Sequence, residues 1–163
     1  MKKLTIIIIA AFTLMGCMSQ EERTIRDYLN GKLTDRAVKA DKVEIIGEDT
    51  VLSLVTMDIL YNDCLINPDD RDKVTELNKY YFDALEIRYA VQMGQKKDPA
   101  ILAKHEFDLR RLAKVKVTGE DGHVSDNIEI IFDVDNKTPY TVGNEYNIDL
   151  NMWEYKVRSV RGY

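Results

Sequence analysis

The sequence contains few of the residues that usually carry a recognisable site. Only two histidines, His105 and His123, occur among its 163 residues, without His-Glu-x-x-His or Cys-x-x-Cys spacing. Glycine-rich phosphate-binding loops are absent, and Ser53 and Ser125 lie outside any Gly-x-Ser-x-Gly motif. The sequence therefore indicates no cofactor, no metal site and no catalytic residue.

Cysteine is equally scarce, with only Cys17 and Cys64 in the chain. A carboxylate next to a thiol raises its pKa, so Asp63 makes Cys64 a poor nucleophile. We expect Cys64 to be a buried free thiol. If Cys17 is modified, an intramolecular disulfide is excluded and stability must come from packing.

Excess positive charge is also lacking, since 28 acidic residues outnumber 23 basic ones and give a net charge of −5. An acidic balance favours solubility and opposes binding to nucleic acid or to anionic lipid headgroups. We therefore expect no nucleic-acid partner.

The one long apolar run lies at the N-terminus. Lys2 and Lys3 precede an apolar stretch over residues 4–15. A membrane-spanning helix needs about 20 apolar residues, so this run is too short, and its charge order is that of a secretory signal.

The end of this run, Leu14-Met15-Gly16-Cys17, resembles the lipobox of bacterial lipoproteins, although Met15 is larger than the residue usual there. The resemblance implies a signal peptide over 1–16, cleavage before Cys17, a diacylglyceryl thioether on its sulfur and an acyl chain such as palmitate on its amine. Two or more chains anchor a protein stably to a membrane. The alternative is an ordinary cleaved signal followed by a chance cysteine.

The mature chain would keep 147 residues, enough for one domain, and loss of the two lysines would bring its net charge to −7. We expect residues 17–20 to form the lipidated tether and residues 21–163 the domain. The implied location is the cell envelope, with the outer membrane favoured.

Glu21 and Glu22 follow the lipid-attachment cysteine closely. An acidic cluster there resembles the surface-export signal of Bacteroidota lipoproteins, and the whole chain resembles small lipoproteins of that group. The alternative is a solvated start to a helix.

Apolar spacing predicts the first half of the fold. Helical spacing favours a helix over 21–33, a longer one over 70–93 that ends at Gly94, and a third beginning at Asp98-Pro99. We expect the last two to pair antiparallel, with Leu102, His105, Leu109 and Leu112 on the buried stripe of the third. Residues 43–46 are predicted to form a strand that ends in a turn at 47–49. The apolar residues of 51–61 follow neither the helical period of 3.6 nor the strand period of two cleanly, but they favour a helix.

In the last third of the chain, the spacing of the apolar residues changes to a period of two. Alternation predicts strands around 115–117, 128–134 and 146–157, separated by turns at 119–122 and 135–143, with a bulge near Met152-Trp153. The predicted fold class is α+β, with helices packed on an antiparallel meander of three to four strands. This order loosely resembles cystatin-like and NTF2-like domains.

Three residue groups remain as candidate sites. His105 is expected to be packed or half-buried on an apolar stripe. Asp133, Asp135 and Asn136 cluster as calcium ligands do, although turn chemistry explains them and no EF-hand loop is present. The aromatic set Tyr80, Tyr81, Phe82 and Tyr89 predicts either a broad buried stripe or a partly exposed contact surface.

These observations favour a non-catalytic envelope lipoprotein that binds or scaffolds a protein, a glycan or another envelope component. One alternative is an enzyme built from scattered Asp, Glu and Tyr residues, and another is an inhibitor or immunity-type protein. A pocket between sheet and helices with two carboxylates of separated pKa would favour the enzyme. A flat or filled interface or an exposed aromatic patch would favour binding. A pocket gathering carboxylates, tyrosines or His105 would favour the enzyme and ligand-binding interpretations.

Overall fold

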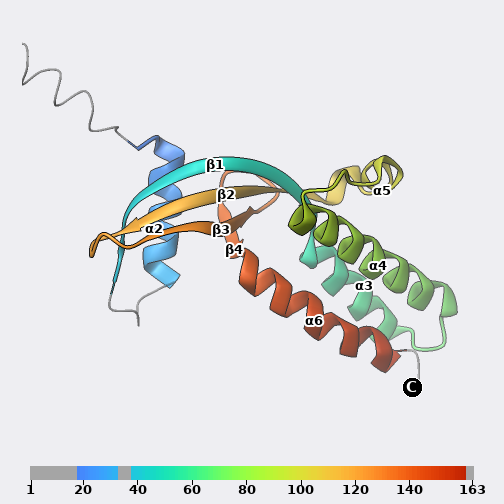
Figure 1. Ribbon diagram of the computed structural model, residues 1–163. Coiled ribbons are helices and arrows are strands. Elements are labelled where there is room, and N and C mark those ends of the chain that lie inside the picture. Colours follow the sequence, from blue (N-terminus) through green and yellow to red (C-terminus); the bar gives the residue numbers. More distant parts are fainter. Residues whose placement is uncertain (1–17, 33–37, 161–163) are drawn as a thin grey trace, which may run out of the picture.

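The computed structural model describes residues 18–32 and 38–160 (Figure 1). Its core element is a four-stranded antiparallel sheet in the order β1-β2-β3-β4. The strands are β1 Ala40–Leu52, β2 Leu109–Gly119, β3 Val124–Phe132 and β4 Pro139–Val142. The helices are α2 Gln20–Lys32, α3 Leu54–Ile66, α4 Arg71–Met93, α5 Pro99–Lys104, the 3-10 turn η1 Glu106–Asp108, and α6 Gly143–Val160. The predicted α+β class and antiparallel sheet are confirmed.

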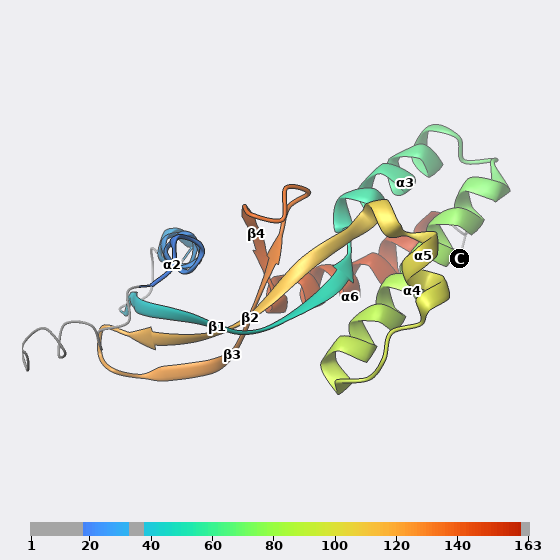
Figure 2. The ribbon, with the colours of Figure 1, turned by 90° about the horizontal axis from the view of Figure 1, so that it is seen from above.

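The helices gather at the two ends of the sheet. Helix α2 lies across one end, whereas α3, α4 and α6 form a group at the other end (Figures 1 and 2). Two buried clusters match this division. Ile25 and Leu29 of α2 pack with Val43 and Phe132, while the larger cluster joins the three helices to the ends of β1 and β2.

Several predicted boundaries are confirmed. The Asp70 carboxylate caps α4 by accepting from the backbone N–H groups of Asp72 and Lys73, and Gly94 ends that helix with a φ of 62°. The Asp98 carboxylate caps α5 by accepting from the backbone N–H of Ala100. The segment around 51–61 does form a helix, α3, although Val51 and Leu52 still belong to β1.

The predicted turn at 47–49 is wrong. Strand β1 continues through it, with one register irregularity between Ile45 and Gly47. The polar side chains there are held by ion pairs, since Glu48 binds Arg111 and Asp49 binds Lys97. These partners come from distant parts of the chain, so local sequence does not reveal them.

The helix predicted from Asp98 is too long. Helix α5 ends at Lys104, and Leu109 and Leu112 lie on β2, where they pair with Leu52 and Asp49 of β1. The predicted pairing of 70–93 with 98–112 therefore does not form. The neighbouring pair is α3 with α4, connected through the short segment 67–70 (Figure 1).

The strands and bulge predicted over 146–157 are also wrong, because this segment is helix α6. Tyr146, Leu150, Trp153 and Val157 share the buried face at spacings of four, three and four. Ile148 and Met152 lie on the exposed face, and they gave the sequence its apparent alternation.

The lipobox residues 14–17, Cys17 included, and the rest of the predicted signal peptide lie outside the described residues. Within the described ranges, no helix is long and apolar enough to cross a membrane. Ser19 and Glu22 form a reciprocal capping box at the start of α2, with N···O distances of 2.7 and 3.1 Å.

Candidate functional site

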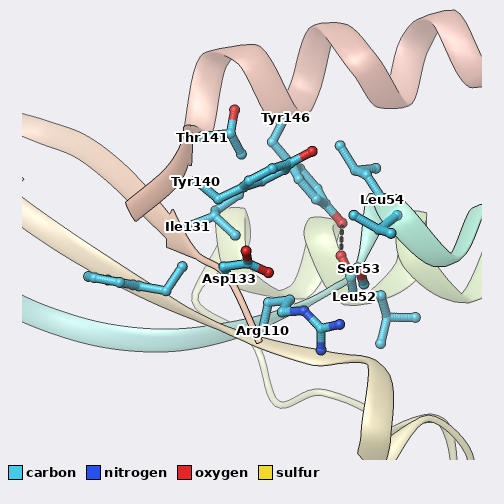
Figure 3. A pocket seen from close by; sticks show the side chains of 11 residues that line it. Leu52, Ser53, Leu54, Arg110, Ile131, Asp133, Tyr140, Thr141 and Tyr146 are labelled. Atoms are coloured by element: carbon cyan, nitrogen blue, oxygen red, sulfur yellow. Dashed lines mark hydrogen bonds between the residues drawn. The ribbon is translucent and has the colours of Figure 1, made fainter. Parts of the chain in front are cut away.

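The junction between α6 and the end of β1 is filled. Figure 3 shows Tyr146 of α6 with its hydroxyl directed at Leu52, and that hydroxyl donates to the Leu52 carbonyl at 2.9 Å. The space left beside it is about 20 Å³, room for about one water molecule. Burial raises the pKa of Tyr146, so its hydroxyl stays protonated and serves as a structural donor. This junction has no room for a substrate.

His105 caps the C-terminal end of α5 and is 8% exposed. Its Nε2 lies 2.8 Å from Asp83 Oδ2, and its ring meets the Tyr80 ring edge-on with centroids 4.8 Å apart. The expected burial of His105 is confirmed, and its ring contacts Asp83 and Tyr80 of α4.

Carboxylates face both nitrogens of the His105 ring. Burial alone would raise the pKa of Asp83, but hydrogen bonds from Lys104 and His105 outweigh it and lower that pKa. The other nitrogen, Nδ1, lies 4.0 Å from Asp108 Oδ2, and Thr56 donates to the same carboxylate at 2.6 Å. A catalytic histidine needs a nucleophile or substrate proton within reach. The His105 ring is hydrogen-bonded to Asp83 of α4 and faces Asp108 of η1, so the cluster joins α4 to the α5–η1 segment.

A cavity of about 490 Å³ adjoins this cluster. Its walls carry charges of both signs, namely Asp72, Glu76, Lys79, Lys104 and Asp108, beside Tyr80 and His105. The size is that of a small-ligand pocket. This cavity gathers carboxylates, a tyrosine and His105, the combination that favours the enzyme and ligand-binding interpretations.

The remaining sequence candidates are not brought together. Cys64 is buried, and desolvation followed by the charge of Asp63 raises the pKa of its thiol, as expected. Ser53 is buried, and its carbonyl accepts from the Tyr80 hydroxyl at 3.0 Å. Ser125 lies on β3, and His123 is exposed in the turn before it.

The predicted calcium candidates form a turn. The Asp135 carboxylate accepts from the backbone N–H groups of Lys137 and Thr138 and from the Thr138 hydroxyl, which lowers the pKa of Asp135 to about 2. Asn136 has a φ of 54°, a conformation that asparagine tolerates in turns. In the part of the chain that is described, no three His, Cys, Asp or Glu side chains converge as metal ligands do.

Sequence reasoning missed Arg88, the most buried charged residue of α4. Its side chain is 6% exposed; Nε donates to Asn147 at 2.7 Å and Nη2 donates to Glu129 at 2.5 Å. The guanidinium carbon lies 5.8 Å from the centre of the Tyr146 ring. The available signal was the position of Arg88 four residues after Ala84, on the apolar stripe of the helix.

One donor of Arg88 has no partner. Nη1 is buried and is the only buried side-chain nitrogen or oxygen among the described residues without a hydrogen bond. Leaving a buried donor unpaired costs about 1–3 kcal/mol. Buried polar groups are otherwise nearly always satisfied, so this unpaired donor is an exception within the described part of the chain.

Arg88 lines a cleft of about 440 Å³ between α4 and the sheet, which we call the α4 cleft. Its lining residues are Ile46, Arg88, Val91, Gln92, Lys114, Asp126, Asn127, Ile128 and Glu129. They come from α4 and from the three strands β1, β2 and β3, so the fold and not a local motif assembles the cleft.

The aromatic set of α4 divides between core and surface. Tyr80 and Tyr81 are buried, whereas Phe82 and Tyr89 are more than half exposed. The predicted buried stripe therefore holds for Tyr80 and Tyr81, and the predicted exposed surface holds for Phe82 and Tyr89.

Helix α6 adds a second exposed apolar set. Ile148, Met152 and Tyr155 lie at spacings of four and three on the outer face, and we call them the α6 stripe. Tyr155 is 74% exposed.

No family model, curated protein or solved structure matches this chain.

Proposed function

We propose that this protein is a lipid-anchored protein of the cell envelope that binds or scaffolds a protein or another envelope component without catalysing a reaction. The observation that carries the proposal is the α6 stripe. Three large apolar side chains, each more than half exposed, follow one another along a single helix face. Exposed apolar patches of this kind mark interaction surfaces in soluble domains.

The position of the stripe supports this proposal. Met18, the residue after Cys17, accepts a hydrogen bond at its sulfur from the backbone N–H of Val43 at 3.3 Å, near the start of β1. From Val43 to Leu52, where the helix group begins, β1 extends over roughly 30 Å. The first turn of α6 lies near the C-terminal end of α2, with Lys32 Nζ 4.0 Å from Glu145 Oε2. A lipid on Cys17 would thus hold the start of α2 near the membrane and leave the C-terminal half of α6 free to meet a partner (Figure 1).

The filled junction between α6 and the end of β1 leaves no space for a substrate there, which favours binding over catalysis at that point. A second candidate, binding of a small polar ligand, is favoured by the cavity beside His105, which combines carboxylates, ammonium groups and a tyrosine. It would act within the same anchored domain.

Two measurements test the proposal. Cys17→Ala should move the protein from the membrane fraction to the soluble fraction and abolish labelling by a radiolabelled fatty acid. Unchanged membrane retention would overturn the lipid anchor.

The binding surface is tested with a photo-crosslinking amino acid placed at Met152 in living cells. We expect a discrete, saturable adduct that disappears when Ile148 and Tyr155 are changed to Ser. The matched control places the same group at Arg23, which is exposed on α2 at the other end of the sheet. Equal adducts at both positions would contradict a specific role for the α6 stripe.

A further inference from the structure

We propose that the α4 cleft binds a small molecule or chain end that carries a carboxylate beside an apolar group, with the carboxylate directed to Arg88 and Lys114. This ligand site is separate from the α6 stripe and does not depend on the proposed function.

The unused hydrogen-bonding capacity of the cleft lies with its cations. Glu129 and Asn147 fix the Arg88 guanidinium through Nη2 and Nε and leave Nη1 without an acceptor. Arg88 is therefore oriented before a ligand arrives, and its remaining N–H groups match a carboxylate oxygen.

Lys114 supplies the second positive charge. Its Nζ lies 4.0 Å from Asp49 Oδ2, too far for a hydrogen bond, while Lys97 binds the other oxygen of that carboxylate. The Lys114 ammonium thus keeps donors available for an oxygen in the cleft.

The acidic residues of the cleft do not offer an equivalent site for a cation. Glu129 is already paired with Arg88, and Asp126 is exposed at the margin, where water solvates it. The apolar part of the lining consists of Ile46, Val91 and Ile128. A ligand with a carboxylate and a short aliphatic group would pair with the cations of the cleft and pack on its apolar lining. The volume of the cleft suits an amino-acid derivative or a peptide C-terminus.

The probe we choose is N-acetyl-leucine, with N-acetyl-leucinamide as its neutral counterpart. Each is titrated at fixed ionic strength into the full-length protein in detergent micelles, with ¹⁵N NMR detection. We expect saturable shifts of the Arg88 Nε–H signal and of the Gln92 and Asn127 side-chain amides with the acid. Binding of the amide should be at least tenfold weaker.

Variants of β2 locate the site. Lys114→Gln should weaken binding of the acid at least fivefold. Lys116→Gln is the matched control, because Lys116 lies two residues further along the same strand and contacts Glu44 at 3.6 Å outside the cleft. It should leave binding unchanged.

Four outcomes would overturn the proposal: equal affinity for acid and amide, equal weakening by both lysine variants, absence of saturable shifts, or an ordered water as the only partner of Nη1. The Cys17→Ala protein should bind the probe normally. A result that contradicts the ligand site can therefore be distinguished from one that contradicts the lipid anchor.

Discussion

Glu21, in the first turn of α2, forms an ion pair with Arg111 of β2, 90 positions later in the chain. The same guanidinium binds Glu48 of β1 and lies 4.7 Å from the centre of the Phe132 ring. Arg111 therefore connects the N-terminal helix to two strands and to the smaller buried cluster. The capping box of Ser19 and Glu22 defines the start of the same helix.

Arg111→Ala should destabilise the domain by about 1–2 kcal/mol, because it removes two ion pairs and a cation–π contact from a side chain that is largely shielded. The measurement is urea unfolding followed by circular dichroism at low and high salt. Arg26→Ala is the control, since Arg26 pairs only with the adjacent, exposed Asp27 and should change stability little. Equal midpoints for Arg111→Ala and the unmodified protein would contradict this role.

The same ion pair gives a test of the export hypothesis for Glu21 and Glu22. If the acidic pair is a surface-export signal, Glu21→Gln with Glu22→Gln should lower protease accessibility of the protein on intact cells. Arg111→Gln removes the Glu21 ion pair but leaves the acidic sequence unchanged, so it should not lower accessibility. A similar decrease in both variants would assign the two glutamates to folding alone.

Local chemistry predicted the helices well where the chain supplies its own caps. The boundaries of α4 follow from the Asp70 cap and from Gly94, and the start of α5 from the Asp98 cap before Pro99. The segment 47–49 was misassigned because its acidic residues are neutralised by Arg111 and Lys97 from far along the chain.

Helix α6 could not be distinguished from a strand by alternation alone. Exposed Ile148 and Met152 mimic a period of two, while buried Tyr146, Leu150 and Trp153 follow the helical period. The α4 cleft could not be predicted from the sequence either, because residues from α4 and three strands assemble it. In the sequence, its buried arginine looks like any other charged residue of a long helix.

Gly143→Ala should destabilise the domain by about 1–3 kcal/mol through overpacking. A Cβ at this first residue of α6 would lie 2.7 Å from the Cβ of Glu129 and 2.6 Å from its Oε2. Glu129 would have to move, and its bond to buried Arg88 would weaken.

The contrasting control for this change is Gly31→Ala. Gly31 lies within α2 with no atom near the position of an added Cβ, so that substitution should stabilise the helix by up to about 1 kcal/mol. Thermal unfolding compares the two variants. Opposite signs are expected, and destabilisation by both would show that the contact with Glu129 is not the cause.

Alkaline pH should unfold the protein through tyrosines that are buried or half-buried. Burial raises the pKa of Tyr28 to about 12 and also raises the pKa values of Tyr80, Tyr81 and Tyr146 above the ordinary value of 10.0. Below that ordinary value, both the folded and the unfolded chain keep these hydroxyls protonated, so their contribution to stability is complete. Above it the unfolded chain ionises first, and stability falls as pH rises toward the folded-state pKa values.

Phenolate absorbance near 295 nm and circular dichroism, followed together during the titration, test this coupling. Part of the phenolate signal should appear together with loss of helix signal. Tyr28→Phe removes one of these groups and should make stability fall less steeply with pH. Tyr155→Phe, at an exposed position of α6, should leave the unfolding midpoint unchanged. If all tyrosines ionise while the helix signal persists, burial does not control their titration.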